Sequence, residues 1–402
     1  MKIVCSTNMP FVEEAFSTLG DAVVLEGRNL KPADVRDAEL MAVRSTTKVD
    51  RALLEGSRVR FVGTATIGTD HMDIPYMEKA GIRWCYAPGC NANSVAEYVT
   101  TALLRQAVRH GFTLAGKTVG VIGVGNVGRL VVRQAEALGL RVLQNDPPRE
   151  RAEEGGNGQS LDIGHQSTEE GRSRQAGRPT RFVSLDRILA ESDVVTFHVP
   201  LTKQGPDKTL HMADQAFFAR LKPGCLFFNC ARGAVVKTDA LLAAMDRGVV
   251  AHAVVDTWEG EPAYRRDLLQ RVDIATPHIA GHSFEGKVMG TVMVYREACR
   301  FLGVAPAWTH EGRLPPPPVP RVAVDAAGRR EEEVLWDIAH RVYDIEADDR
   351  RFRAASAEAD FEHFDRLRRD YPMRREFRFT TVSLKNASEA LTRRVAAIGF
   401  QV

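Results

Sequence analysis

Residues 118–128 read Thr118-Val-Gly-Val-Ile-Gly-Val-Gly-Asn-Val-Gly128. The first five residues form an apolar stretch typical of a buried strand, and the residues after them continue with helical spacing. Gly123 permits a tight turn, Gly125 lets the backbone approach a pyrophosphate, and Gly128 lets the helix pack closely on the strand. The loop thus predicts a dinucleotide site. Its expected contact residues are Gly123, Gly125, Asn126, Val127 and Gly128.

An acidic residue follows the next apolar segment. Residues 141–145 are expected to form the second strand, and Asp146 comes directly after it. A carboxylate at this point can accept hydrogen bonds from both hydroxyls of an adenosine ribose and would repel a 2′-phosphate. We therefore predict NAD rather than NADP as the cofactor, although Arg149 nearby could offset part of that repulsion. A glycine turn that binds nothing is the alternative interpretation.

Short apolar segments alternate with amphipathic ones over most of the chain, as in parallel sheets covered by helices. The first series of expected strands comprises residues 2–5, 22–25, 40–43, 59–63 and 82–86. The second comprises residues 118–122, 141–145, 194–198, 225–229, 251–256 and 273–275. The pattern predicts an α/β fold with two doubly wound, Rossmann-like domains. Helices are expected over residues 94–110, with Ser94 and Glu97 as a capping box, and over residues 283–302.

The domain boundaries follow from composition. Four prolines at residues 315–318 indicate a stiff linker, followed by a strand, two Arg/Glu-rich helices, a strand at 378–384 and a helix. Residues 149–180 are rich in Gly, Glu, Arg, Ser and Gln and are expected to be a mobile surface insertion. We expect a substrate domain, an NAD-binding domain and a small α+β domain. Their residues are 1–95 with 281–305, 96–280, and 321–402 respectively.

Composition excludes several classes of protein. The chain has 402 residues, is 44% hydrophobic, and carries a formal charge of +2 from 54 basic and 52 acidic residues. That balance favours neither a nucleic acid nor a membrane surface as partner. The six cysteines are scattered, and we find neither a signal peptide nor a bilayer-spanning apolar run. We therefore expect a cytoplasmic protein with reduced cysteines.

Three residues with complementary chemistry follow successive strands of the second series. Arg232 lies in Asn-Cys-Ala-Arg-Gly-Ala, Glu261 in Glu-Gly-Glu-Pro, and His278 in Thr-Pro-His-Ile-Ala-Gly. An arginine can clamp a carboxylate with two parallel hydrogen bonds, and a histidine oriented by a glutamate can take a hydroxyl proton. Alone, each has a structural explanation: a buried ion pair, a solvated loop carboxylate or a structural histidine. Together, beside a nicotinamide, they predict oxidation of a 2-hydroxy acid.

With these motifs the chain resembles the D-isomer-specific 2-hydroxyacid dehydrogenases. The resemblance covers nearly the whole chain and includes a C-terminal domain that generic members lack. Within the family, the chain resembles the members that act on a phosphorylated four-carbon hydroxy acid. The more specific marks are Val43-Arg-Ser-Thr-Thr-Lys-Val, Phe61-Val-Gly-Thr-Ala-Thr-Ile-Gly-Thr-Asp-His, Ala87-Pro-Gly-Cys-Asn-Ala, Asp146-Pro-Pro, Gly205-Pro and Glu285-Gly-Lys.

The resemblance implies further roles. Ser45 and Thr66 would contact substrate, while Asp146, Asp256 and Gly281 would contact NAD. Asp256 could hydrogen-bond the carboxamide of the nicotinamide. The last domain would form a homodimer, and no metal is expected.

Two positions depart from the family pattern. His282 stands where the family has a substrate-contacting tyrosine, and Val199 stands where it has a threonine beside the cofactor. These departures concern substrate identity and cofactor affinity rather than reaction type. For the substrate phosphate, the loop that begins at Arg44 and ends at Lys48 is a candidate donor.

Two alternative functions stay open at this point. Another member of the family, of the phosphoglycerate or hydroxypyruvate type, would share the catalytic residues, but the C-terminal domain argues against it. A regulator that senses NAD without turnover would share the fold, but it would not need a general base.

Overall fold

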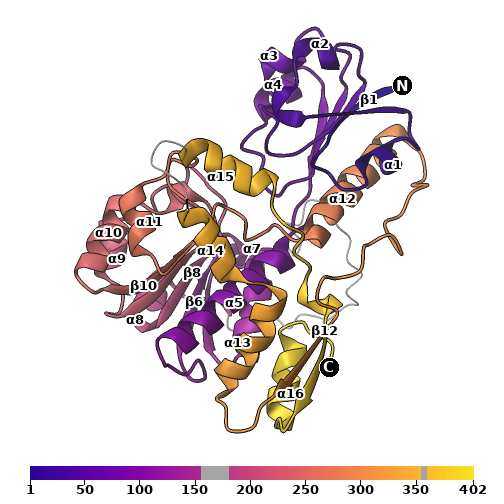
Figure 1. Ribbon diagram of the computed structural model, residues 1–402. Helices are drawn as coiled ribbons and strands as arrows, with labels where there is room; N and C mark the ends of the chain where they lie inside the picture. The colour runs from indigo at the N-terminus through magenta and orange to yellow at the C-terminus, as the bar shows by residue number, and fades with distance from the viewer. Residues whose placement is uncertain (155–180, 355–359) are drawn as a thin grey trace. The chain divides into compact units, whose positions relative to one another are not determined.

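The computed structural model of the protein describes residues 1–154, 181–354 and 360–402 (Figure 1). These residues form two units, Met1–Asn93 with His282–Pro316, and Ser94–Gly281 with Pro317–Val402. We call them unit 1 and unit 2. Of the insertion expected at residues 149–180, residues 149–154 form the end of a helix and the rest lies outside the described residues.

Unit 1 is built on a parallel sheet with the order β2-β1-β3-β4-β5. Its strands are β1 (Lys2–Ser6), β2 (Asp21–Leu25), β3 (Leu40–Val43), β4 (Phe61–Thr64) and β5 (Arg83–Tyr86). Its helices are α1 (Val12–Phe16), α2 (Pro32–Val35), α3 (Arg51–Leu54), α4 (Ile74–Lys79) and α12 (Phe284–Leu302), with a 3-10 turn η1 at Gly27–Asn29. The order is that of a doubly wound sheet, with a crossover beside β1.

Helix α12 packs directly on β4 because two glycines allow close approach. A Cβ atom at Gly63 would lie 2.3 Å from Val294 Cγ1, and one at Gly290 would lie 2.8 Å from the carbonyl oxygen of Ala65. Apolar side chains of α12 therefore share one core with those of the sheet. The return of the chain to unit 1 after residue 281 thus completes the core of this unit.

Unit 2 is built on a six-stranded parallel sheet with the order β11-β10-β9-β8-β6-β7. Its strands are β6 (Thr118–Ile122), β7 (Arg141–Asn145), β8 (Val194–Phe197), β9 (Cys225–Asn229), β10 (Val250–Val255) and β11 (Ile274–Ala275). Its helices are α5 (Ala92–Arg109), α6 (Gly128–Ala137), α7 (Pro147–Glu154), α8 (Leu185–Glu191), α9 (Gln215–Ala219), α10 (Thr238–Asp246) and α11 (Arg266–Arg271). A parallel bridge from Gln144 to Phe182 extends the sheet beyond β7, as in a dinucleotide-binding domain.

The C-terminal residues add a small parallel sheet of β12 (Arg321–Asp325) and β13 (Thr381–Lys385). The helices around it are α13 (Glu331–Val342), α14 (Ile345–Arg353), α15 (Asp360–Arg369) and α16 (Glu389–Ala397), with a 3-10 turn η3 at Phe377–Phe379. Apolar residues of this segment and of α5 and α6 belong to one buried cluster, so the segment packs as part of unit 2. The predicted α/β fold with two Rossmann-like sheets and a small third sheet is confirmed.

Three local predictions were wrong. The strand predicted at residues 378–384 begins only at Thr381, because residues 377–379 form a 3-10 turn. Among the described residues, three helices (α13, α14 and α15) lie between β12 and β13 where two were predicted, and α14 is separate from α13 since the Asp344 carboxylate caps it by accepting from the amide of Ala347 at 2.8 Å. Helix α5 begins at Ala92, ahead of the predicted capping box.

The two residues of that capping box contact the C-terminal segment instead. Glu97 Oε1 accepts from the amide of Phe377 at 2.9 Å, and Ser94 Oγ donates to Glu376 Oε1 at 3.4 Å. Both side chains are buried, so their hydrogen bonds help to hold residues 376–377 on α5.

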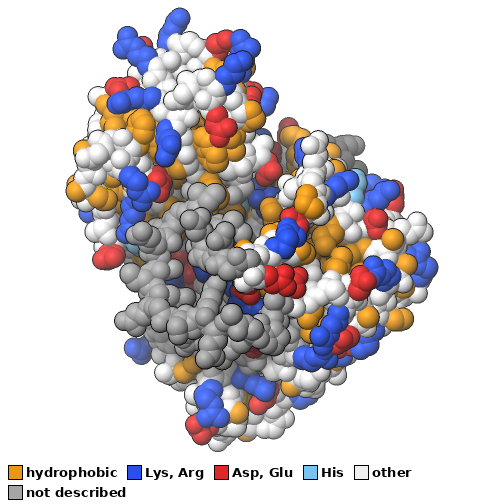
Figure 2. All heavy atoms as spheres, turned by 180° about the vertical axis from the view of Figure 1, so that it is seen from behind, with side chains coloured by type: hydrophobic (Ala, Val, Ile, Leu, Met, Phe, Trp, Pro, Cys, Tyr) orange, Lys and Arg blue, Asp and Glu red, His pale blue; other side chains and the backbone are white. Residues whose placement is uncertain are grey.

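The surface is mixed in charge. On the face in Figure 2, Lys and Arg side chains are interspersed with Asp and Glu side chains, as the near-neutral net charge suggests. Among the helices of the described residues, none combines the length and the hydropathy needed to cross a bilayer.

Candidate active site

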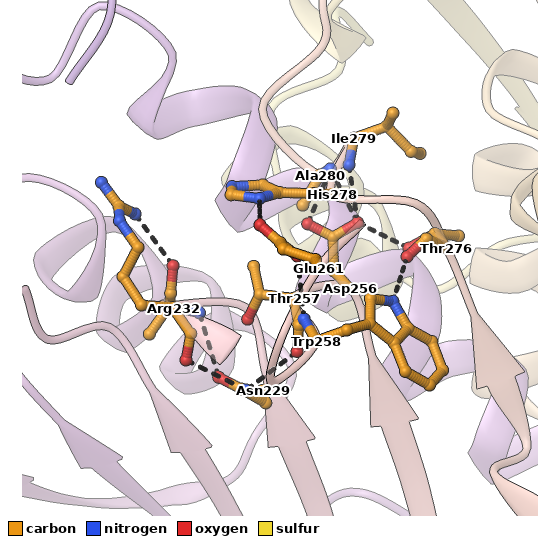
Figure 3. Close-up of polar contacts among 11 residues, drawn as sticks. Asn229, Arg232, Asp256, Thr257, Trp258, Glu261, Thr276, His278, Ile279 and Ala280 are labelled. Atoms are coloured by element: carbon orange, nitrogen blue, oxygen red, sulfur yellow. Dashed lines mark hydrogen bonds and ion pairs between the residues drawn. The ribbon is translucent and has the colours of Figure 1, made fainter. Parts of the chain in front are cut away.

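The loops that follow β9, β10 and β11 bring Arg232, Glu261 and His278 to the carboxyl edge of the unit 2 sheet (Figure 3). Carboxyl ends of neighbouring parallel strands meet at one edge, where open α/β sheets bind their ligands. The structure therefore brings together the three residues that the sequence predicted as a catalytic set.

The loop of Arg232 is held in place by the side chain of Asn229. The Asn229 amide group donates to the carbonyl oxygens of Arg232 at 3.3 Å and of Thr257 at 3.1 Å. A Cβ atom at Gly233 would lie 1.9 Å from the carbonyl oxygen of Trp258, so only glycine allows the two loops to lie this close. Asn229 thus connects the loop of the cation to the loop that carries Glu261.

Glu261 holds the imidazole of His278. One carboxylate oxygen, Oε1, pairs with His278 Nδ1, and the other accepts from the amide of Trp258 at 2.9 Å. Burial alone would raise the pKa of Glu261, but the charge of His278 and these hydrogen bonds outweigh burial and lower it. Glu261 therefore stays ionised, and because it binds Nδ1, the other ring nitrogen, Nε2, is the atom of His278 that can take a proton.

The backbone of His278 is strained. Its φ angle is 56°, in the left-handed region that residues with a side chain rarely adopt, and its amide donates to the carbonyl oxygen of Asp256 at 2.7 Å. Such conformations persist where the surroundings impose them, and they are frequent at active sites.

Asp256 imposes the conformation of this loop. Its side chain is buried and accepts from Thr276 Oγ1 at 2.6 Å, from the amide of Ile279 at 2.8 Å and from the amide of Ala280 at 3.1 Å. Burial raises the pKa of this carboxyl above its usual value, while the charge of His278 and these donors oppose the rise. The carboxylate thus binds both sides of His278. Its predicted contact with the nicotinamide stays a prediction.

A second layer of side chains supports the loop from behind. Tyr98 Oη lies 2.7 Å from Thr276 Oγ1, and Trp258 Nε1 donates to the carbonyl oxygen of Thr276 at 2.8 Å. The Trp258 ring meets the ring of Phe352 on α14 edge to face, with centroids 5.5 Å apart. The C-terminal segment therefore supports the catalytic loop. The sequence pattern did not identify these residues, because buried aromatic and hydroxyl groups carry no local signal of their role.

The glycine loop fits a pyrophosphate. Gly123 has φ 87°, and a Cβ atom at Gly128 would lie 2.0 Å from the carbonyl oxygen of Gly123, so both glycines are required by the turn. At Gly125, in contrast, a Cβ atom would meet nothing within 4 Å. Of the three glycines of this loop, Gly125 is the one with open space beside it, as expected where a ligand approaches the backbone. The loop precedes α6, whose N-terminus favours negative charge.

Two further predicted cofactor residues adjoin this loop. Asp146 Oδ2 accepts from the amide of Val124 at 2.7 Å, which fixes the carboxylate beside the turn. Val199 lies over Gly123, because a Cβ atom there would come within 2.8 Å of Val199 Cγ1. The contacts of Asp146 and Val199 with NAD stay predictions, as do those of Asn126, Val127 and Gly281.

The predicted substrate residues of unit 1 lie at the carboxyl edge of its own sheet. Arg44 follows β3 and donates to the carbonyl oxygen of Asn8 at 3.1 Å, and Ser45 beside it is exposed. Thr66 follows β4, and its hydroxyl donates to the carbonyl oxygen of Gly68 at 2.8 Å. His282 comes just before Ser283, the cap of α12. Their contacts with substrate stay predictions.

The chain matches two family models. Residues 91–280 match the NAD binding domain of D-isomer specific 2-hydroxyacid dehydrogenase. Residues 313–399 match a domain of unknown function. The first match covers the glycine loop and all three catalytic candidates, and the second covers most of the C-terminal segment.

Similar proteins extend the match to the whole chain. The erythronate-4-phosphate dehydrogenase of Edwardsiella ictaluri is 44% identical over 400 residues, which cover 100% of this chain and 99% of that protein. The erythronate-4-phosphate dehydrogenase of Cronobacter sakazakii is 42% identical over 400 residues, which cover 100% of this chain and 98% of that protein.

Solved structures confirm the fold. The 3-phosphoglycerate dehydrogenase of Entamoeba histolytica with bound NAD⁺ matches with a TM-score of 0.60 at 22% identity, over 75% of this chain and 95% of that chain. The D-lactate dehydrogenase of Aquifex aeolicus with NAD and lactic acid matches with a TM-score of 0.58 at 24% identity, over 75% and 95%. At these identities the likeness concerns the fold alone.

Proposed function

Because the chain belongs to the erythronate-4-phosphate dehydrogenases of the D-isomer specific 2-hydroxyacid dehydrogenase family, we propose that it oxidises 4-phospho-D-erythronate to 2-oxo-3-hydroxy-4-phosphobutanoate. This reaction is a step of pyridoxal 5′-phosphate biosynthesis. The chain is an NAD-dependent oxidoreductase of that family. The observation that carries the proposal is the Glu261-bound imidazole of His278 at the same sheet edge as Arg232.

Arg232 would bind the C1 carboxylate of the substrate. A guanidinium has five N–H donors in a planar fork that matches the two oxygens of a carboxylate. Asn229 and Gly233 hold the backbone of the Arg232 loop, which supports a fixed origin for this side chain. Positioning of this kind contributes to catalysis by reducing the entropy lost in the transition state.

His278 would act as the general base. Its Nε2 takes the proton of the C2 hydroxyl while the C2–H bond breaks and the C2=O bond forms. When bound, NAD supplies the acceptor for the hydride that leaves C2. Glu261, kept ionised by its hydrogen bonds, stabilises the imidazolium that results. In the reverse direction the same imidazolium returns the proton.

A substrate comparison tests this function. Purified protein with NAD is offered 4-phospho-D-erythronate, 3-phosphoglycerate and D-lactate, with a 2-oxo acid present to reoxidise tightly held NADH. We expect the highest kcat/KM for 4-phospho-D-erythronate. A preference for 3-phosphoglycerate would indicate another activity of the same family, and binding of NADH without turnover of any hydroxy acid would indicate a sensor.

We also propose that the chain forms a homodimer through residues 321–402. Large apolar side chains are exposed in this segment at Phe361 (54% exposed), Met373 (47%) and Val402 (55%). A second copy could cover these side chains if the segment forms the interface. Light scattering of the purified protein should give twice the chain mass of 44.4 kDa, and Phe361→Asp with Met373→Asp should lower it.

The cytoplasm is the proposed location. All six cysteines are free in the structure, and four of them are buried. Unpaired buried thiols are typical of proteins in reducing compartments. Fractionation of cells that express the chain should recover it with cytoplasmic markers.

A further inference from the structure

The C-terminal segment reaches the catalytic loop through one buried arginine. Arg374, between α15 and η3, is 5% exposed, and its two terminal nitrogens bind two different carbonyl oxygens. Nη1 donates to the carbonyl oxygen of Ala280 at 3.1 Å, and Nη2 donates to that of Ser94 at 2.7 Å. Ala280 lies two residues after His278, and Ser94 lies in the first turn of α5. One guanidinium thus joins the catalytic loop to the start of α5.

The guanidinium of Arg374 is also held by an aromatic ring. The ring of Tyr343 is buried, and its centroid lies 3.7 Å from Arg374 Cζ, close enough for a cation–π contact. A buried charge is costly unless it is paired and hydrogen-bonded. Arg374 has a ring face and two carbonyl oxygens as partners, and its planar fork fixes the direction of both hydrogen bonds. A residue of the C-terminal segment therefore determines where the Ala280 carbonyl points.

The backbone of Ala280 is held at both of its polar groups. Its amide donates to the Asp256 carboxylate at 3.1 Å, as Figure 3 shows, while its carbonyl oxygen accepts from Arg374. The peptide bond that follows, between Ala280 and Gly281, is trans, so its C=O and N–H groups point in opposite directions. The hydrogen bond that fixes the Ala280 carbonyl therefore also fixes the direction of the Gly281 amide.

The Gly281 amide points away from Arg374, and Gly281 is one of the residues predicted to contact NAD. His278 precedes it by three residues, so one short loop carries both the general base and the predicted cofactor contact. Asp256 holds the part of this loop nearer to His278, by accepting from two successive amides. Arg374 holds the peptide that comes after them. The two buried side chains therefore act on neighbouring parts of the loop, one on the base and the other on the cofactor contact.

We propose that Arg374 is a positioning residue for the cofactor: by holding the Ala280 carbonyl, it directs the Gly281 amide toward NAD. This inference rests on the proposed function, since it needs a bound nicotinamide cofactor. It goes beyond that function by giving the C-terminal segment a part in cofactor binding. The segment would then serve both the homodimer and the active site of its own chain.

NADH binding by a variant of Arg374 tests this role. Fluorescence titration gives the Kd of NADH without any hydroxy acid, so the result does not depend on the identity of the substrate. Arg374→Met removes both hydrogen bonds, and we expect the Kd of NADH to rise about 3- to 10-fold, as for the loss of one well-placed hydrogen bond. Because Asp256 still holds the loop of His278, kcat at saturating NAD should change less than about threefold.

A matched control separates this role from a loss of stability. Thr380→Val also removes a buried hydrogen bond to a backbone carbonyl in the C-terminal segment, the one from Thr380 Oγ1 to Val319 at 2.7 Å. Both variants should lower the melting temperature, because each leaves a carbonyl oxygen without this donor. Of the two, Arg374→Met should weaken NADH binding, and Thr380→Val should leave it unchanged.

A second variant decides the question if Arg374→Met does not fold. Arg374→Lys keeps a charge beside the Tyr343 ring, but a single ammonium cannot take the places of both terminal nitrogens, so the Kd of NADH should rise about threefold. An unchanged Kd in the folded variants of Arg374, or an equal rise in Thr380→Val, would overturn the inference. Inactivity of the unmodified protein on 4-phospho-D-erythronate would instead contradict the proposed function, while the NADH titration would still test Arg374.

Discussion

The charged side chains at the carboxyl edges of the two parallel sheets are arranged in opposite ways. In unit 2, His278 pairs with Glu261 inside the protein, and Asp256 binds the backbone on both sides of the histidine. In unit 1, Arg44 and Lys287 bring two like charges together, and the Lys287 ammonium is largely desolvated. One edge thus pairs opposite charges, while at the other edge one cation lowers the pKa of another.

The difference concerns the protonation state that each edge favours. A general base must be ready in one protonation state and one orientation, so its partner belongs to the protein. In unit 1, in contrast, burial and the nearby charge of Arg44 disfavour the charged state of Lys287 and lower its pKa.

The largest effect on kcat should come from breaking the pair of His278 and Glu261 in unit 2. His278→Asn removes the imidazole, while asparagine tolerates the φ of 56° better than alanine would. We expect kcat to fall about 10²- to 10⁴-fold, the usual contribution of a general base. Steady-state rates with 4-phospho-D-erythronate measure the fall, and NADH fluorescence should show unchanged cofactor binding. A kcat within a factor of a few of the original would remove His278 from the mechanism.

Cofactor binding can be separated from chemistry at the glycine loop. Gly125→Val fills the open space beside the backbone, so the KM for NAD should rise about 10- to 100-fold while the melting temperature stays the same. Gly123→Ala is the contrasting variant, because φ is 87° and the new Cβ would lie 2.8 Å from the His198 carbonyl. It should destabilise the fold by about 1–3 kcal/mol. Equal effects of both variants on stability would contradict the assignment.

Replacing Asp256, which holds the loop of His278, should have a smaller effect on kcat. Asp256→Ala leaves the buried amides of Ile279 and Ala280 without their acceptor, at a cost of about 1–3 kcal/mol for each group. Urea unfolding measures that loss, and kcat should fall about tenfold as His278 loses its fixed position. Asp256→Asn keeps one acceptor oxygen and should lose less stability. If Asp256→Asn raises the KM for NAD selectively, the predicted nicotinamide contact gains support.

The smallest effect should be a gain in the stability of the protein when Lys287 in unit 1 is replaced. The pKa of Lys287 is lowered from 10.5 to about 8 in the folded chain, so its charge opposes folding below pH 8. This cost in the free energy of unfolding falls as the pH rises from 8 to 10.5, because over that range the unfolded chain binds more protons than the folded chain. Lys287→Met should therefore add about 1–3 kcal/mol at pH 7 in phosphate-free buffer, and the difference should shrink over that pH range. A variant less stable than the original at pH 7 would contradict this picture.

Much of the candidate site could be predicted from local sequence. Strand, turn and helix patterns placed Arg232, Glu261 and His278 just after successive strands, and parallel strands bring their carboxyl ends to one edge. The glycine loop could be predicted equally well, because its three glycines have distinct roles in the turn. The capping box at Ser94 was misread, since these side chains bind residues 376–377, some 280 positions away.

The sequence by itself determined the fold class, the succession of strands along the chain and the chemistry of the catalytic residues, because periodicity and turn residues act over a few positions. Only the tertiary structure revealed that Asp256 holds the His278 loop, that Phe352 of the last segment supports Trp258, and that Lys287 lies beside Arg44. Those contacts join residues far apart in the chain, and their energies depend on burial and on neighbouring charges. Neither quantity exists until the chain has folded.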